Sequence, residues 1–121
     1  MITIKSFTFN PFQENTYVAF DETNECIIVD PGCYDHEENK LLKCYIEENH
    51  LKPVALINTH CHLDHVFGNK FVSDTFNLKP LMHKLDLPML EYAPLAATKY
   101  GVHLAELPEV EGFIEEGDVV K

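Results

Sequence analysis

Four residues of the kinds that bind metal ions stand close together in the chain: His60, His62, Asp64 and His65. Neutral imidazole nitrogens and ionised carboxylates are ligands that borderline metal ions such as zinc accept. In an extended segment alternate side chains point the same way, so His60 and His62 are expected to face one point. Asp64 and His65 then face a neighbouring point. The run therefore predicts a site for two metal ions.

An apolar segment, Val54 to Ile57, precedes this cluster and predicts a buried strand. Histidines also gather by chance on solvated surfaces, and an isolated His-x-His pair is more often a surface feature than a ligand pair. Here the strand delivers three His and one Asp to its carboxyl end, where α/β folds tend to place their chemistry. The density and the placement together favour a metal site.

The residues before this strand predict an antiparallel meander followed by a helix. Strands are expected over residues 2–9, 16–20 and 26–29, with a hairpin turn over 21–25. Asp35, followed by Glu38 three residues later, is typical of a capping box at a helix start. The apolar face of that helix is expected to consist of Leu41, Leu42, Tyr45 and Ile46.

The residues after the cluster predict further alternation of helix and strand. A helix is expected over residues 66–76 and a short strand over 81–83. A second helical stretch, over residues 86–100, contains Pro88 and Pro94, which are expected to break it, and it ends at Gly101. The pattern as a whole predicts an α/β protein.

At this point the sequence resembles the metallo-β-lactamase fold hydrolases, whose signature is His-x-His-x-Asp-His after a strand. The resemblance also covers Asn15-Thr16-Tyr17, Asp30-Pro31-Gly32 and Gly68-Asn69, which occur in the family's order. Within the family, the chain is most similar to the glyoxalase II-like branch. The resemblance implies the amino-terminal half of an αββα sandwich, with a mostly antiparallel sheet and flanking helices.

The length of 121 residues covers little more than the first of the two similar halves from which the family is built. We therefore expect residues 1–121 to form a single truncated domain, the amino-terminal part of a longer hydrolase. The family's later ligands, namely a third His, a bridging Asp and a last His, have no counterpart in the sequence. We expect these residues alone to be inactive.

The resemblance implies the following roles for the cluster in the complete enzyme. His60 and His62 bind the first of two zinc ions with the later His, and Asp64 and His65 bind the second with the last His. Hydroxide formed from water between the two cations attacks the carbonyl of a small acyl substrate such as a thioester. Asp64 also has a catalytic role, because it helps to orient the nucleophile. Asp30 lies beneath the metal run and is expected to orient a ligand or its loop rather than bind metal.

Two other functions stay open. An iron-dependent redox protein of the same fold, either a sulfur dioxygenase or a flavodiiron protein, uses a similar set of His and Asp ligands. Iron and manganese are therefore the alternatives to zinc. The other alternative is a catalytically incomplete fragment that binds metal weakly or not at all.

The charge of the chain bears on its partners, and its apolar runs and opening residues bear on its location. A formal net charge of -11, from 20 acidic and 9 basic residues, argues against binding to nucleic acid, which requires clustered Lys and Arg. No apolar run approaches the roughly 18 residues of a membrane span, and no signal peptide is evident, so a cytoplasmic location is expected. A small-molecule substrate is the expected partner. Loss of a second half would also expose apolar surface and favour self-association.

The four cysteines, Cys26, Cys33, Cys44 and Cys61, show no Cys-x-x-Cys pair and no dense disulfide pattern. We expect free thiols. Cys61 lies between two candidate ligands, but the alternation of an extended segment points its side chain away from them.

Overall fold

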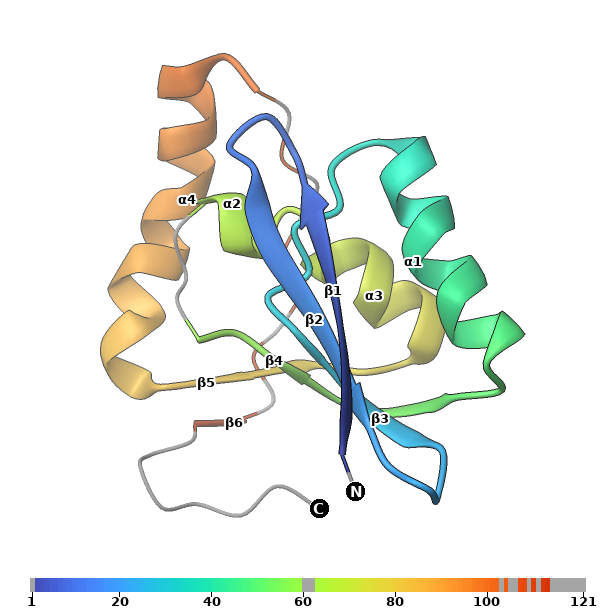
Figure 1. The fold of residues 1–121 in the computed structure, drawn as a ribbon. Coiled ribbons are helices and arrows are strands. Elements are labelled where there is room, and N and C mark those ends of the chain that lie inside the picture. Colours follow the sequence, from blue (N-terminus) through green and yellow to red (C-terminus); the bar gives the residue numbers. More distant parts are fainter. Residues whose placement is uncertain are drawn as a thin grey trace.

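A computed structural model gives the fold of residues 2–59, 63–102, 104, 107–108, 110 and 112–113. These residues form a sheet with the strand order β1-β2-β3-β4-β5-β6 and helices packed around it (Figure 1). The first three strands are β1 (Thr3–Phe9), β2 (Glu14–Phe20) and β3 (Glu25–Val29). Both of their pairings are antiparallel, so the expected meander is confirmed.

The rest of the sheet is parallel. Helix α1 (His36–Glu48) leads to β4 (Lys52–Ile57), and α2 (Leu63–Val66) and α3 (Asn69–Phe76) lead to β5 (Pro80–Met82). A 3-10 turn, η1 (Lys84–Asp86), then α4 (Leu87–Tyr100), precede β6 (Gly112–Phe113). Each later strand pairs parallel with its predecessor because a helix carries the chain back between them. The parallel part is larger than the sequence indicated.

Helix α1 starts where its sequence predicts. The Asp35 carboxylate accepts a hydrogen bond of 2.9 Å from the Glu38 N–H, as in a capping box. The Glu38 carboxylate accepts instead from the N–H groups of Tyr34 at 2.8 Å and Asn10 at 2.9 Å. The second half of the motif therefore ties the helix start to the loop that follows β1.

Two groups of apolar side chains make up the core. The first lies between α1, α3 and the inner face of strands β1 to β4, and includes Val18, Ile28, Leu42, Ile46, Leu56 and Val72. The second joins α2, β5 and α4, and includes Leu63, Val66, Met82, Leu90, Ala93 and Ala97. Leu41, which was expected on the buried face of α1, is 57% exposed, because Leu42 and Ile46 already fill the contact with the sheet.

The helix expected over residues 66–76 is divided in two by Phe67 and Gly68. Gly68 donates a backbone hydrogen bond of 2.7 Å to the Pro31 carbonyl. A Cβ atom on Gly68 would lie 2.7 Å from that same oxygen. The close approach of two backbone segments therefore interrupts the helix and places α2 directly over the loop that follows β3.

Helix α4 runs without interruption through Pro94, contrary to the expected break. Pro88 stands in the first turn, where an N–H group has no partner within the helix in any case. Pro94 removes one hydrogen bond from the helix interior. The burial of Leu90, Ala93 and Ala97 against α2 and β5 offsets that loss.

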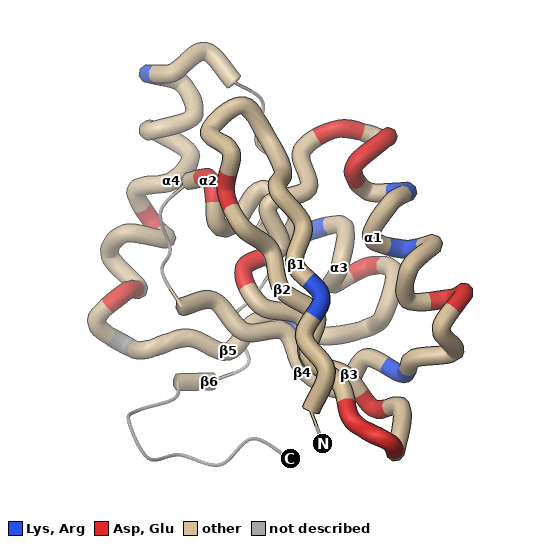
Figure 2. The backbone as a smooth tube through the Cα atoms, in the orientation of Figure 1, with Lys and Arg blue, Asp and Glu red and all other residues tan. Residues whose placement is uncertain are grey.

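The distribution of Lys residues and the lengths of the helices bear on binding to nucleic acid and to membranes. Among the described residues, the Lys positions are spread along the backbone over several elements, with Asp and Glu positions between them (Figure 2). Within the same part of the chain, no helix is long and apolar enough to cross a membrane.

Candidate metal centre

The parallel pairing of β3 and β4 brings the residues after both strands together. The Asp30 N–H donates a hydrogen bond of 2.8 Å to the Ile57 carbonyl. In return, the Asp30 carboxylate accepts hydrogen bonds from Thr59, one of 2.7 Å from the N–H group and a second from the hydroxyl. Asp30 therefore anchors the first residue of the Thr-His-Cys-His-Leu-Asp-His run.

The backbone of Asp30 has an unusual conformation, with a φ angle of 51°. A non-glycine residue in this left-handed region costs free energy, which other contacts must offset. The Thr16 hydroxyl supplies two of these contacts: it donates to the Asp30 carbonyl and accepts from the Gly32 N–H, both at 2.9 Å. The buried hydroxyl of β2 thus holds the turn that aims the Asp30 carboxylate.

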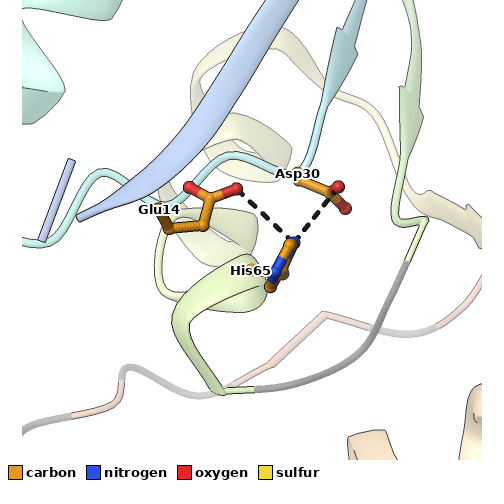
Figure 3. A group of neighbouring side chains, drawn as sticks. All are labelled: Glu14, Asp30 and His65. Carbon is orange, nitrogen blue, oxygen red and sulfur yellow. Dashed lines mark ion pairs between the residues drawn. The ribbon is translucent and has the colours of Figure 1, made fainter. Parts of the chain in front are cut away.

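His65 stands between three carboxylates. Its Nδ1 atom lies 3.2 Å from an Asp30 oxygen and 3.5 Å from a Glu14 oxygen (Figure 3). Its Nε2 atom lies 3.7 Å from an Asp64 oxygen. The hydrogen bond to Asp30 raises the pKa of His65, against the opposing effect of burial. One edge of the imidazole ring is thus held by buried acids, and the other faces Asp64, which is more exposed.

Glu14 is a further acid at this centre that was not predicted from the sequence. This residue is only 4% exposed, and its carboxylate lies 3.0 Å from the Thr16 hydroxyl, which shares its one proton between Glu14 and the Asp30 carbonyl. Burial, assisted by the nearby charges of Asp30, Asp64 and Glu38, raises the pKa of Glu14 to about 9, although the Thr16 bond lowers it. The signal that was overlooked is strand parity. Glu14 shares the buried face of β2 with Thr16 and Val18, but the strand had been expected to begin only at residue 16.

The groups gathered around His65 are of the kinds that hold a divalent cation. Single ligand atoms of Glu14, Asp30 and His65 all lie within 4.8 Å of one another. Glu14 Oε1 is buried and accepts no hydrogen bond from any of the described residues. A buried carboxylate oxygen is costly without a proton or a cation beside it. Carboxylate oxygen and imidazole nitrogen are also suitable ligands for zinc, iron or manganese.

Two asparagine side chains hold the short helix that carries Asp64 and His65. The Asn10 amide donates hydrogen bonds of 3.0 Å to the carbonyl oxygens of Asp64 and Gly32. The Asn58 amide donates one of 3.2 Å to the carbonyl of His65. Asn58 also forms a reciprocal pair of hydrogen bonds with Asn69, at 2.8 and 3.2 Å. Both consecutive carbonyls are therefore fixed by side chains, one from 54 positions earlier and one from seven positions earlier in the chain.

A cavity of about 380 Å³ opens at this centre and is lined by residues that include Glu14, Asp30, Thr59, Asp64 and His65. The structure thus brings together Asp30, Asp64 and His65 of the residues expected from the sequence. His60, His62 and Cys61 lie outside the described residues. Cys26, Cys33 and Cys44 are free thiols, as expected.

The chain is similar to proteins of a known family. A family model described as the metallo-beta-lactamase superfamily matches residues 9–120. The probable metallo-hydrolase YqgX of Bacillus subtilis (strain 168) is 32% identical over 85 residues, which make up 70% of this chain and 38% of that protein. The hydroxyacylglutathione hydrolase of Klebsiella pneumoniae (strain ATCC 700721 / MGH 78578) is 42% identical over 66 residues, 54% of this chain and 24% of that protein.

Among solved structures, TTHA1623 in a di-iron-bound form is 34% identical and superposes with a TM-score of 0.79. The match covers 96% of this chain and 56% of that one. This likeness confirms the fold expected from the sequence, the amino-terminal half of an αββα sandwich. The chain spans about half of the length of the curated relatives that it matches, or less.

Proposed function

The chain belongs to the metallo-beta-lactamase superfamily, and we propose that it acts as a metal-dependent hydrolase of acyl thioesters. The reaction adds water across the thioester: the carbon–sulfur bond breaks, the acyl group leaves as a carboxylic acid, and the sulfur leaves as a thiol. The observation that carries the proposal is the position of His65, with one ring nitrogen held by buried acids and the other facing Asp64.

Asp64 and His65 would hold one divalent cation, and His60 and His62 would hold the other. Zinc is the ion we expect, with two ions in the complete enzyme. A bound cation supplies Lewis acidity, which lowers the pKa of water and polarises a carbonyl group. Asp64, which lines the open cavity, would in addition orient the attacking water through its carboxylate.

The buried acids have a separate role. A metal-binding histidine commonly donates its other ring N–H to a carboxylate, which fixes the tautomer and the direction of the ring. Asp30, 3.2 Å from His65 Nδ1, has the geometry for this role. Because Asp30 also binds Thr59, the same carboxylate would align His65 and the segment that begins at His60.

The thioester substrate rests on the likeness to hydroxyacylglutathione hydrolase, which is 42% identical over 66 residues. The test uses S-D-lactoylglutathione as substrate and measures hydrolysis together with metal content per chain. Protein made from the full reading frame is compared with residues 1–121 alone. We expect two zinc ions and hydrolysis in the former, and at most one ion and little activity in the latter.

A matched pair of variants makes this test specific. Asp64→Asn is expected to lower activity at least a hundredfold and to reduce the metal content. Asp74→Asn, on the exposed side of α3, where Asp74 pairs with Lys70, should leave both unchanged. Full activity of Asp64→Asn, or the absence of metal from both proteins, would contradict the proposal.

The second candidate is an iron-dependent redox function. It is favoured by one observation, the di-iron form in which the 34% identical TTHA1623 was solved. The ligand types do not separate the two functions, because imidazole and carboxylate bind iron as well as zinc. Iron in the freshly purified protein, with no hydrolysis of the thioester, would favour the redox function.

A further inference from the structure

A second cavity lies beside the candidate metal centre. It has a volume of about 260 Å³ and is lined by residues of α2, α4 and the loop between β1 and β2. Its walls are mostly apolar and aromatic, and include Phe12, Leu63, Met89, Tyr92, Ala96 and Tyr100. Among the described residues that line it, Asp64 is the one charged group.

The two cavities meet at Phe12 and Asp64, which line both of them. On one side of this pair lie Glu14, Asp30 and His65, and on the other lies the apolar cavity. A molecule that spans both sides would place its polar, reacting group at the candidate metal centre and its apolar group against α4. The shared boundary therefore joins a reaction site to a second site of opposite polarity.

The aromatic wall is held in a defined position. The Phe12 ring stands edge-on to Tyr100, with ring centroids 5.3 Å apart, and stacks on Phe67 at 6.2 Å. The Phe12 N–H donates a hydrogen bond of 2.9 Å to the Asn10 side chain, whose amide group also holds Asp64. On α4, the Lys99 ammonium donates a hydrogen bond of 2.8 Å to the Tyr92 hydroxyl. Side chains from both the loop and α4 are therefore held by contacts of their own, as in small-molecule sites, which are usually pre-formed.

Size and charge define the group that fits. An apolar cavity of about 150 Å³ accepts a benzene molecule, so one of about 260 Å³ has room for a benzene-sized group with a short linker. No cation lines the cavity among the described residues, so an anionic group would have no partner of opposite charge in its wall. A neutral apolar group is thus favoured over a carboxylate or a phosphate.

We propose that this cavity binds a neutral apolar substituent, about the size of a benzyl group, attached to the thioester that is hydrolysed at the neighbouring centre. The inference rests on the proposed function and adds a substrate class to it. The class consists of thioesters that carry a benzyl-sized group close to the reacting carbonyl. The substituent belongs either to the acyl group or to the thiol, and the substrates of the test distinguish the two.

The test compares three thioesters on the metal-loaded protein made from the full reading frame. They are S-acetyl-N-acetylcysteamine, S-phenylacetyl-N-acetylcysteamine and S-benzyl thioacetate. We expect kcat/KM to be at least tenfold higher for one of the two benzyl compounds than for the acetyl compound. The phenylacetyl compound assigns the substituent to the acyl group, and S-benzyl thioacetate assigns it to the thiol. Equal kcat/KM values for all three would overturn the inference, although hydrolysis itself would support the proposed function.

Variants connect the preference to the cavity. Ala96→Met places a longer side chain inside it, and Phe12→Ala removes part of its wall from an exposed loop, where folding is little affected. Each variant should reduce the ratio of the benzyl to the acetyl kcat/KM at least fivefold. Leu95→Ala, on the same helix but 53% exposed and outside the cavity lining, should leave the ratio unchanged. A ratio that neither variant lowers would overturn the inference.

Binding provides a measurement that does not depend on hydrolysis. By ligand-observed NMR, 2-phenylacetamide should bind at least tenfold more tightly than acetamide, and Ala96→Met should abolish the difference. If no thioester is hydrolysed, the proposed function fails, and this binding difference alone decides whether the cavity is a site for an apolar group. The absence of any such difference would then overturn the inference as well.

Discussion

The side-chain amide of Asn10 donates a hydrogen bond of 3.0 Å to the backbone carbonyl of Asp64, 54 positions later in the chain. The same amide nitrogen donates to the Gly32 carbonyl, and the amide oxygen accepts from the Phe12 N–H. One side chain thus connects three segments: the loop between β1 and β2, the turn after β3, and the helix that carries Asp64 and His65. The position of Asp64 depends on this connection.

Replacing Asn10 tests the connection. Asn10 has a φ angle of 61°, which glycine adopts without strain, so Asn10→Gly removes the amide and keeps the backbone. We expect the free energy of unfolding to fall by about 1–3 kcal/mol, because the carbonyls of Asp64 and Gly32 lose their donor. Urea denaturation measures this change. Gln13→Gly, at a φ of 56° in the same loop, is the backbone control and should be neutral or stabilising. An equal loss in both variants would assign the effect to the backbone.

Asp30→Asn tests whether the Asp30 carboxylate raises the pKa of His65. In the metal-free protein Asp30 raises the folded pKa of His65 above its unfolded value. The protonated His65 therefore contributes to the stability of the fold. This contribution is fully present at pH values below the unfolded pKa of about 6.5. It is lost as the pH rises through the higher folded pKa. In Asp30→Asn we expect the His65 pKa to fall, as measured by NMR titration of the imidazole. Asp74→Asn is the control for loss of a distant, exposed carboxylate. An unchanged His65 pKa in Asp30→Asn would contradict the assignment.

Glu14→Gln tests the buried acid that the sequence analysis missed. The folded pKa of Glu14 is raised to about 9, above its ordinary value of 4.5, so the folded state binds its proton more tightly than the unfolded state. Glu14 should therefore contribute stability to the metal-free protein that is fully present below pH 4.5 and is lost as the pH rises towards 9. In Glu14→Gln this part of the pH dependence should disappear, so the variant should exceed the wild type in stability near pH 8.

The measurement for Glu14 is chemical denaturation of metal-free protein at several pH values between 5 and 9. Glu25→Gln, at the exposed start of β3, is the matched control and should keep the pH dependence of the wild type. Added zinc should reverse the order at pH 8, because a cation stabilises the ionised carboxylate of the wild type but not the amide of the variant. A wild type whose metal-free stability rises over this pH range would refute the prediction.

The reciprocal pair of Asn58 and Asn69 allows a double-mutant cycle. Both side chains are buried, and each amide group donates a hydrogen bond to the other. Asn58→Ala and Asn69→Ala should each cost about 1–3 kcal/mol of unfolding free energy, because each leaves a buried partner unsatisfied. The double variant should cost less than the sum of the two. Additive losses in urea denaturation would mean that the pair is not coupled.

The same two variants separate fold stability from metal binding. Asn58 donates to the His65 carbonyl as well as to Asn69. We therefore expect Asn58→Ala to weaken zinc binding more than Asn69→Ala does, at equal loss of stability. Isothermal titration with zinc measures the difference, and equal affinities in the two variants would show that the contact with His65 does not affect the ligand.

The sequence by itself determined the elements and the ligand run. The alternation of apolar residues in β1 to β3, the Asp35 cap and the apolar strand before His60 are local signals, because they depend on neighbouring side chains and backbone conformation. The Asp-Pro-Gly turn after a strand is also a local signal, although it was the family resemblance that marked Asp30 as a residue beside the candidate site. Each of these features is encoded within a few positions of the chain.

Tertiary structure alone decided which side chains surround His65 and Asp64. Glu14 and Asn10 become neighbours of the ligand run only through strand order, register and the parallel pairing of β3 with β4. Their contacts span up to 54 positions, and no local pattern specifies them. The continuity of α4 through Pro94 has the same origin. A local rule predicts a break there, but the free energy gained by burying one face of the helix against α2 and β5 outweighs the hydrogen bond that Pro94 removes.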